Sequence, residues 1–146
     1  GDTTAMDNSA VRGMALFKSK ARCILCHNGP NFTDNQFHNL GVPQVGPLKE
    51  DLGRYNVTKA EKDKAAFKTP TLRSIIETAP YMHDGAFKTL EEVVDFLNVG
   101  GGANPSLSTL VKPLNLTSEE KADLVVFLKA LTGEPIPFQF PKLPKN

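Results

Sequence analysis

One short motif, Cys-Ile-Leu-Cys-His at residues 23 to 27, limits the fold of this chain more than any other feature of the sequence. Two thiols stand three positions apart, and an imidazole follows at once. This C-x-x-C-H spacing is the attachment signature of haem c, in which each thiol adds to one vinyl group of the porphyrin and the histidine binds the iron. The motif therefore predicts one covalent haem held by Cys23 and Cys26, with His27 as the proximal iron ligand.

Other chemistries also use a C-x-x-C pair. A thioredoxin-like redox site needs a βαβ context, which the sequence pattern does not indicate, and a zinc ribbon needs a second cysteine pair. The chain has two cysteines in all, so that second pair is missing. A helical binding domain with a local disulfide is a third alternative. The attachment signature favours haem over all three.

Composition limits the class of protein. A chain of 146 residues with 40% hydrophobic content suits one compact domain with its own core. The near balance of 17 basic and 16 acidic residues argues against a nucleic-acid partner. No apolar run of about 18 residues predicts a membrane span. The polar opening residues 1–4 are typical of a mature or trimmed product.

Hydrophobic spacing predicts a mainly α-helical chain with long connections. Ser9 is a candidate N-cap for a first helix that runs to about Ala21 and leads into the cysteine motif. Residues 69–76 place a proline in an acceptable first-turn position and predict a short helix. Two capping boxes, which start at Thr89 and Thr117, predict two further helices. These are expected to end near Gly100 and Gly133.

Long irregular segments complete the pattern. Residues 28–68 are rich in Gly, Pro, Asn and Asp and predict loops that wrap a large planar cofactor. The fold expected for residues 1–133 is therefore a cytochrome c-like helical domain whose long loops surround one covalent haem. Four prolines between 134 and 146 predict an extended tail, with Phe138 and Phe140 as candidates for holding it to the surface.

The sixth iron ligand has five candidate side chains: Met6, Met14, His38, Met82 and His83. Met14 lies in an apolar stripe, where methionine usually fills the core, and Met6 lies near a terminus. Met82 is better placed, in a loop between two helices. His38 and His83 could bind iron, but each lies beside an Asx residue or in a polar turn, so we expect them to support a ligand or to contact a haem propionate.

Arg73 has two interpretations of its own. It is either a partner of a haem propionate or an ordinary surface charge.

Several further motifs together resemble one known family, the bacterial di-haem cytochrome c peroxidases and their methylamine-utilisation relatives. The resemblance is to the C-terminal domain and covers nearly the whole chain. The residues that carry it are Arg12-Gly13, Leu16-Phe17, the segment from His27 to Asp34, the segment from Phe37 to Gly41, the segment from Phe67 to Arg73, and the segment from Ala79 to Gly85.

The resemblance implies an electron-entry domain in the bacterial periplasm. In that family the C-terminal haem receives electrons from a small cytochrome or copper protein and passes them to a second haem domain, which reduces hydrogen peroxide. It also implies a calcium ion bound partly by the carbonyls of Thr78 and Pro80. The family places its sixth ligand, Met or Tyr, at the position of Leu97, and leucine cannot bind iron.

Two functions follow as hypotheses. The first is an electron-transfer module, the electron-entry half of a di-haem peroxidase-like oxidoreductase. The alternative is a stand-alone haem peroxidase or small-ligand sensor, with an open or exchangeable site on the side that Leu97 leaves without a ligand.

Overall fold

The computed structural model describes residues 4–47, 50–134 and 137–141. These contain four α-helices and one two-stranded sheet, so the predicted mainly helical architecture is confirmed. The helices are α1 (Asn8–Lys18), α2 (Tyr55–Thr58), α3 (Leu90–Asn98) and α4 (Ser118–Lys129). The strands are β1 (Phe37–His38) and β2 (Phe67–Lys68), and the 3-10 turns are η1 (Cys23–Leu25), η2 (Glu61–Asp63) and η3 (Ile75–Thr78).

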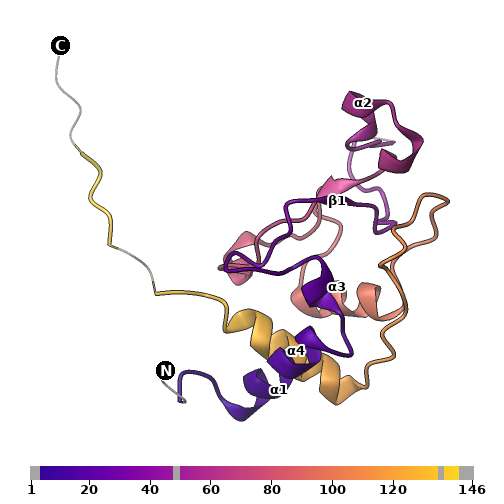
Figure 1. The fold of residues 1–146 in the computed structure, drawn as a ribbon. Coiled ribbons are helices and arrows are strands. Elements are labelled where there is room, and N and C mark those ends of the chain that lie inside the picture. The colour runs from indigo at the N-terminus through magenta and orange to yellow at the C-terminus, as the bar shows by residue number, and fades with distance from the viewer. Residues whose placement is uncertain (1–3, 48–49, 135–136, 142–146) are drawn as a thin grey trace.

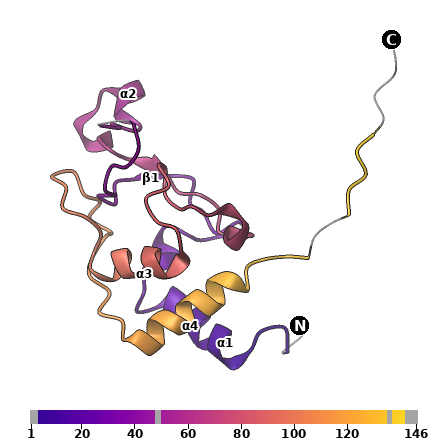
Figure 2. The same cartoon turned by 180° about the vertical axis from the view of Figure 1, so that it is seen from behind.

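Three of the four helices lie at one end of the molecule, and the sheet and α2 lie at the other (Figures 1 and 2). In both views α1, α3 and α4 gather at one end, while β1 and α2 lie at the other (Figures 1 and 2). The antiparallel sheet places His38 opposite Phe67. The long connections that join the two ends carry most of the residues that sequence analysis singled out.

The core lies where α1 crosses α4. Phe17 and Leu124 are its largest fully buried side chains. The rings of Phe17 and Phe127 meet edge to face, with centroids 5.2 Å apart, a geometry that aromatic pairs prefer. At the same crossing the Arg12 guanidinium donates two hydrogen bonds to the buried Asp123 carboxylate. The two ends of the chain are thus joined by both apolar and charged contacts.

Both predicted capping boxes are confirmed. Thr89 accepts the Glu92 N–H at the start of α3, and Thr117 accepts the Glu120 N–H at the start of α4. In each box the glutamate side chain returns to the N–H of the threonine. This reciprocal pairing satisfies backbone donors that a helix start otherwise leaves without partners.

The first helix begins and ends earlier than predicted. Its N-cap is Asp7, whose carboxylate accepts the Ala10 N–H, whereas the Ser9 hydroxyl donates to Asp123. The helix ends at Lys18, because Ser19 leaves helical geometry and Arg22 adopts a left-handed backbone with φ +57°. That turn directs the chain into η1 and the cysteine motif.

The helix predicted for residues 69–76 is wrong. The Thr69 N–H pairs with the Gln36 carbonyl, which draws the segment along β1 instead of into a helix. Helical turns begin only at Ile75, as η3, after Ser74 in the left-handed region. Residues 69–72 instead have no regular structure, Arg73 begins a turn, and the segment is bonded to the loop after His27.

Part of the predicted tail lies outside the described residues, at 135–136 and 142–146. Phe138 and Phe140 are 70% and 87% exposed, so neither holds the tail to the surface as predicted. Their rings contact each other instead, with centroids 5.2 Å apart.

Candidate haem-binding site

A cavity of about 830 Å³ lies between the long loops and α3. Cys23, Cys26 and His27 belong to its wall, as do apolar side chains that include Leu72, Val93 and Leu97. Its volume is in the upper part of the roughly 300 to 1,000 Å³ that buried ligands usually occupy. The predicted attachment residues therefore share one wall of a space large enough for a cofactor.

The turn η1 brings the three motif residues together. The N–H groups of Cys26 and His27 both bond to the Cys23 carbonyl, at 3.2 and 2.8 Å. This tight turn places the two sulfurs and the imidazole on the same cavity. Residues spaced as in C-x-x-C-H can thus act on one planar ligand.

The state of the thiols argues against a thioredoxin-like redox pair. Both cysteines are free. Burial raises the pKa of Cys23 to about 12, and burial together with the charge of Asp34 raises the pKa of Cys26 to about 11. Redox cysteines of that class have a lowered pKa, because the thiolate is the attacking form. These thiols are protonated at neutral pH instead.

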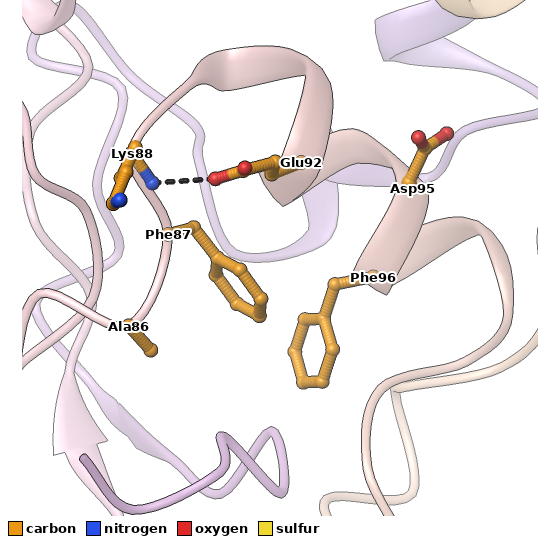
Figure 3. Close-up of a pocket in the computed structure, with 6 residues that line it drawn as sticks. All are labelled: Ala86, Phe87, Lys88, Glu92, Asp95 and Phe96. Carbon is orange, nitrogen blue, oxygen red and sulfur yellow. Dashed lines mark hydrogen bonds between the residues drawn. The ribbon is translucent and has the colours of Figure 1, made fainter.

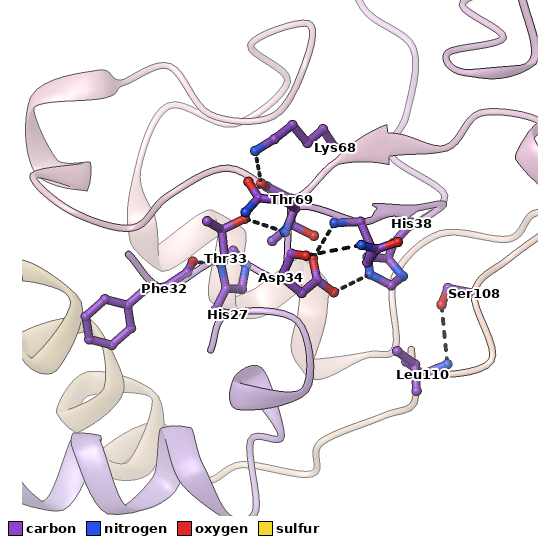
Figure 4. A network of polar contacts seen from close by, with 11 residues as sticks. His27, Phe32, Thr33, Asp34, His38, Lys68, Thr69, Ser108 and Leu110 are labelled. Carbon is purple, nitrogen blue, oxygen red and sulfur yellow. Dashed lines mark hydrogen bonds and ion pairs between the residues drawn. The ribbon is translucent and has the colours of Figure 1, made fainter. Parts of the chain in front are cut away.

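The His27 ring is held in one tautomer. Its Nδ1–H donates to the Phe32 carbonyl at 2.9 Å (Figure 4). Burial, the largest influence, lowers the pKa of His27, against the opposing effects of that hydrogen bond and of Asp34. The ring is therefore neutral with its proton on Nδ1, and Nε2 keeps a lone pair for a metal. A metal-bound histidine almost always has this arrangement.

The loop that supplies this carbonyl is tied on both sides. The Asp34 N–H bonds to the Cys26 carbonyl at 2.8 Å, and the Thr33 hydroxyl donates to the Thr69 carbonyl at 2.7 Å (Figure 4). These bonds join the loop to the cysteine motif on one side and to the segment after β2 on the other. The Phe32 carbonyl is thus part of a braced structure.

Asp34 and His38 form a pair next to the motif. The His38 Nε2 lies 2.8 Å from an Asp34 carboxylate oxygen. Burial alone would raise the pKa of Asp34, but hydrogen bonds from His38 and from the Gln36 N–H outweigh it, and the pKa is lowered. His38 thus uses Nε2 on Asp34 and lines the same cavity, and Nδ1 is the ring nitrogen left for another partner.

Cys26 lies near this pair, and ligand atoms of the three side chains lie within 4.8 Å of one another. Thiolate, imidazole and carboxylate are all ligands that zinc accepts. The same sulfur is the one that the attachment motif assigns to a porphyrin, and it cannot serve both groups.

The candidates for the sixth ligand are separated by the fold. His38, Met82 and His83 all line the cavity, as does Leu97 of α3. The His83 ring is stacked flat on Phe67, with centroids 3.6 Å apart. Met6 and Met14 pack against the helical core, and in the described part of the chain neither belongs to the cavity wall. Of the three methionines, Met82 is the one that reaches the cavity.

The remaining predicted site residues lie at the periphery. Thr78 and Pro80 are exposed and border the cavity. Among the described residues that line the cavity, Arg73 is not present, and its guanidinium donates to the Pro30 carbonyl. The Phe32 carbonyl and the Thr69 carbonyl are parts of the site that the sequence does not predict. A backbone acceptor has no side-chain signature, so nothing in the pattern could have identified them.

A second, smaller hollow of about 510 Å³ lies beside α3 (Figure 3). Phe87 and Phe96 face each other there, with ring centroids 4.9 Å apart. The Glu92 carboxylate at its edge accepts the Lys88 N–H, an extension of the α3 capping box. None of the predicted site residues belongs to its wall as described.

Known proteins with similar sequences include cytochrome-c peroxidases and methylamine utilization proteins. No family model matches the chain. It is 43% identical over 172 aligned positions to the cytochrome-c peroxidase IdrP1 of Pseudomonas sp., and the alignment covers 99% of this chain and 45% of that protein. It is 41% identical over 144 aligned positions to the methylamine utilization protein MauG of Methylorubrum extorquens, and that alignment covers 99% of this chain and 40% of that protein.

Among solved structures, a MauG-like protein associated with microbial copper homeostasis superimposes with a TM-score of 0.80 and 34% identity, which covers 88% of this chain and 48% of that one. The chain therefore spans less than half the length of the relatives it matches. Among the described residues, no helix is both long and apolar enough to cross a membrane.

Proposed function

This chain belongs to the family of di-haem cytochrome c peroxidases and MauG proteins, and from that membership we propose that it is the electron-entry haem domain of such a protein. It binds one haem c through Cys23 and Cys26, with His27 as proximal ligand. It takes electrons from a small donor protein and passes them to a second haem domain. Peroxide reduction belongs to that second domain.

One observation supports this proposal above the others. The His27 ring, fixed by its bond to the Phe32 carbonyl, shares a cavity wall with two protonated thiols. A thiol of this kind adds across a vinyl group, with the sulfur bonding to one carbon and the hydrogen passing to the other. The donor set and the size of the cavity therefore fit a covalent porphyrin.

The residues of this chain have separate tasks in electron transfer. A bound haem supplies a centre that accepts and releases one electron. Cys23 and Cys26 would hold the ring covalently, and His27 would bind its iron. Apolar side chains such as Val93 and Leu97 line the same cavity and would exclude water from it. Such a shell controls solvent access and local dielectric, and through them the reduction potential.

Met82 is our proposal for the sixth ligand. It lines the cavity, and the Leu97 side chain at the family's ligand position has no atom that binds iron. A methionine in this place raises the reduction potential and blocks access to the iron, both of which suit electron transfer. His83, stacked on Phe67, is proposed to contact the haem edge.

A calcium site at Thr78 and Pro80 is proposed as a half-site. Calcium takes about six to eight oxygen ligands, and these two carbonyls supply only part of that number. Both residues are exposed, so a neighbouring domain can reach the ion, and we propose that it supplies the other ligands. Titration of the chain with Ca²⁺, alone and joined to its partner domain, tests this, and binding that does not depend on the partner would contradict it.

The partners and the compartment follow from the same family membership. We propose a periplasmic protein whose donor is a small cytochrome or copper protein that docks weakly near the exposed haem edge. Stopped-flow reduction of the haem-loaded chain by a small reduced cytochrome or copper protein measures this step.

Mass spectrometry and visible spectra of the chain produced with haem-attachment machinery test the central proposal. We expect the intact mass to exceed that of the polypeptide by one haem, and the reduced protein to have a narrow low-spin α-band. Replacement of both cysteines by alanine should abolish the covalent mass. An unmodified mass for the wild-type chain would refute the proposal. Rapid binding of carbon monoxide by the ferrous protein would indicate an open distal site instead.

A further inference from the structure

We propose that Arg73 is a positioning residue for the proximal ligand, because it holds the loop whose Phe32 carbonyl accepts the His27 Nδ1–H. The proposal rests on the proposed function, since it concerns the residue that binds the iron. It assigns Arg73 neither to a haem carboxylate nor to an idle surface charge.

The guanidinium of Arg73 is turned toward the loop after His27. Its Nε and Nη2 both donate to the Pro30 carbonyl, at 3.0 and 2.7 Å. The guanidinium carbon Cζ also lies over the Phe32 ring, 4.9 Å from the ring centroid. The Arg73 side chain thus contacts the loop at Pro30 and at Phe32, the two neighbours of Asn31.

Two other residues of the segment 69–73 also form hydrogen bonds with this loop. The Thr71 hydroxyl donates to the Asn31 carbonyl at 2.6 Å. Two residues earlier, the Thr69 carbonyl accepts the Thr33 hydroxyl at 2.7 Å (Figure 4). Residues 69–73 therefore bond to the loop at Pro30, Asn31 and Thr33, on both sides of Phe32.

Phe32 needs this support because its backbone is strained. Its φ is +52°, in the left-handed region that side chains other than glycine seldom adopt. Such a conformation persists only where its surroundings over-determine it. The Phe32 ring is anchored by edge contacts to Phe17 and Phe127. Arg73 covers the ring and fixes the preceding turn, so the Phe32 carbonyl keeps its direction toward His27.

The direction of that carbonyl matters for the iron. A hydrogen bond from the free ring nitrogen of a metal-bound histidine raises the basicity of the ligand. A more basic ligand stabilises the oxidised metal and lowers the reduction potential. Loss of Arg73 lets the Phe32 backbone relax, weakens the bond from His27, and shifts the potential upward.

The test compares Arg73→Gln with Arg54→Gln in the haem-loaded protein. Arg54 is a matched control, since its guanidinium bonds to Asp63 and lies 4.2 Å from the Phe37 ring centroid, away from the loop after His27. Two quantities are measured: the reduction potential, and the exchange rate of the His27 Nδ1–H by paramagnetic NMR. We expect a positive shift and faster exchange in Arg73→Gln, partial recovery in Arg73→Lys, and neither change in Arg54→Gln.

Equal potentials and equal exchange rates in the two glutamine variants would overturn the proposal. If Arg73→Gln does not accumulate with haem, Thr71→Val provides the same comparison without a change in charge, because it removes the adjacent bond to Asn31. In that variant an unchanged potential and exchange rate would count against the proposal. A wild-type chain without covalent haem would refute the proposed function itself, which the intact mass reveals before any potential is measured.

Discussion

Gly13 of α1 lies so close to Asp123 of α4 that a Cβ atom at Gly13 would overlap the Asp123 carbonyl oxygen. The same atom would stand 2.8 Å from the Cβ of Phe127. The two helices can therefore approach to this distance only because residue 13 has no side chain.

Gly13→Ala is expected to destabilise the protein. Alanine favours a helix over glycine by about 1 kcal/mol, but overpacking a core contact costs roughly 1 to 3 kcal/mol, and here the neighbour is rigid backbone. We expect the overpacking to outweigh the helix preference and the Tm to fall. Gly133→Ala is the control, since a Cβ there meets nothing within 4 Å. A Tm that rises in Gly13→Ala would contradict the close approach.

The Asp123 carboxylate makes the folding stability depend on pH. Hydrogen bonds from Arg12 and then from Ser9 lower the pKa of Asp123. A carboxylate with a lowered folded-state pKa contributes stability that is complete above its unfolded value of about 3.9, and that is lost as pH falls through the folded value. Asp123→Asn should therefore lower the Tm at pH 7. The difference from wild type should shrink below about pH 4, and thermal melts across this range measure it. A constant difference would show that the charge is not responsible.

The capping boxes of α3 and α4 should contribute measurably. Thr89→Ala and Thr117→Ala each remove the acceptor for an N–H of the first turn. The expected cost is about 1 kcal/mol for each, and the two effects should add because the caps are separate. Denaturant unfolding measures both. Thr109→Ala, at an exposed threonine between the two helices, is the control.

Leu97 offers a gain-of-ligand experiment. If Met82 is the sixth ligand, Met82→Ala removes the near-infrared charge-transfer band that a methionine ligand gives the oxidised protein. Addition of Leu97→Met should restore that band, because residue 97 lines the same cavity on α3. Persistence of the band in Met82→Ala alone would exclude Met82. If Leu97→Met does not restore the band, residue 97 of α3 is too far from the iron to bind it.

Some of this molecule could be predicted from its sequence. Family kinship and the mainly helical fold are confirmed, as are both capping boxes. These features depend on short-range rules: a threonine three residues before a glutamate, or a hydrophobic stripe at helical spacing. The convergence of Cys23, Cys26 and His27 on one cavity is of the same kind, since one turn brings them together.

Other features depended on contacts between distant segments. Ser9 looked like a helix cap, but Asp123, far along the chain, takes its hydroxyl. The pattern of residues 69–76 predicts a helix, but the Thr71 hydroxyl is bonded to the loop after His27 and the Thr69 N–H to the Gln36 carbonyl. A tertiary partner overrides local propensity in both cases. The role of Arg73 was open for the same reason, since its acceptor is the backbone of Pro30.

The crossing of α1 and α4 also has a consequence for the order of folding. Arg12 and Asp123, which meet there, stand 111 positions apart in the chain. Contacts of such long range form late, because closing the intervening loop costs conformational entropy before the contacts themselves can stabilise the fold. The turn that carries Cys23 and Cys26 is closed by bonds over three and four residues, and no residue of α4 belongs to the described wall of the cavity. The turn that presents the two thiols therefore does not depend on the α1–α4 crossing and can form before it.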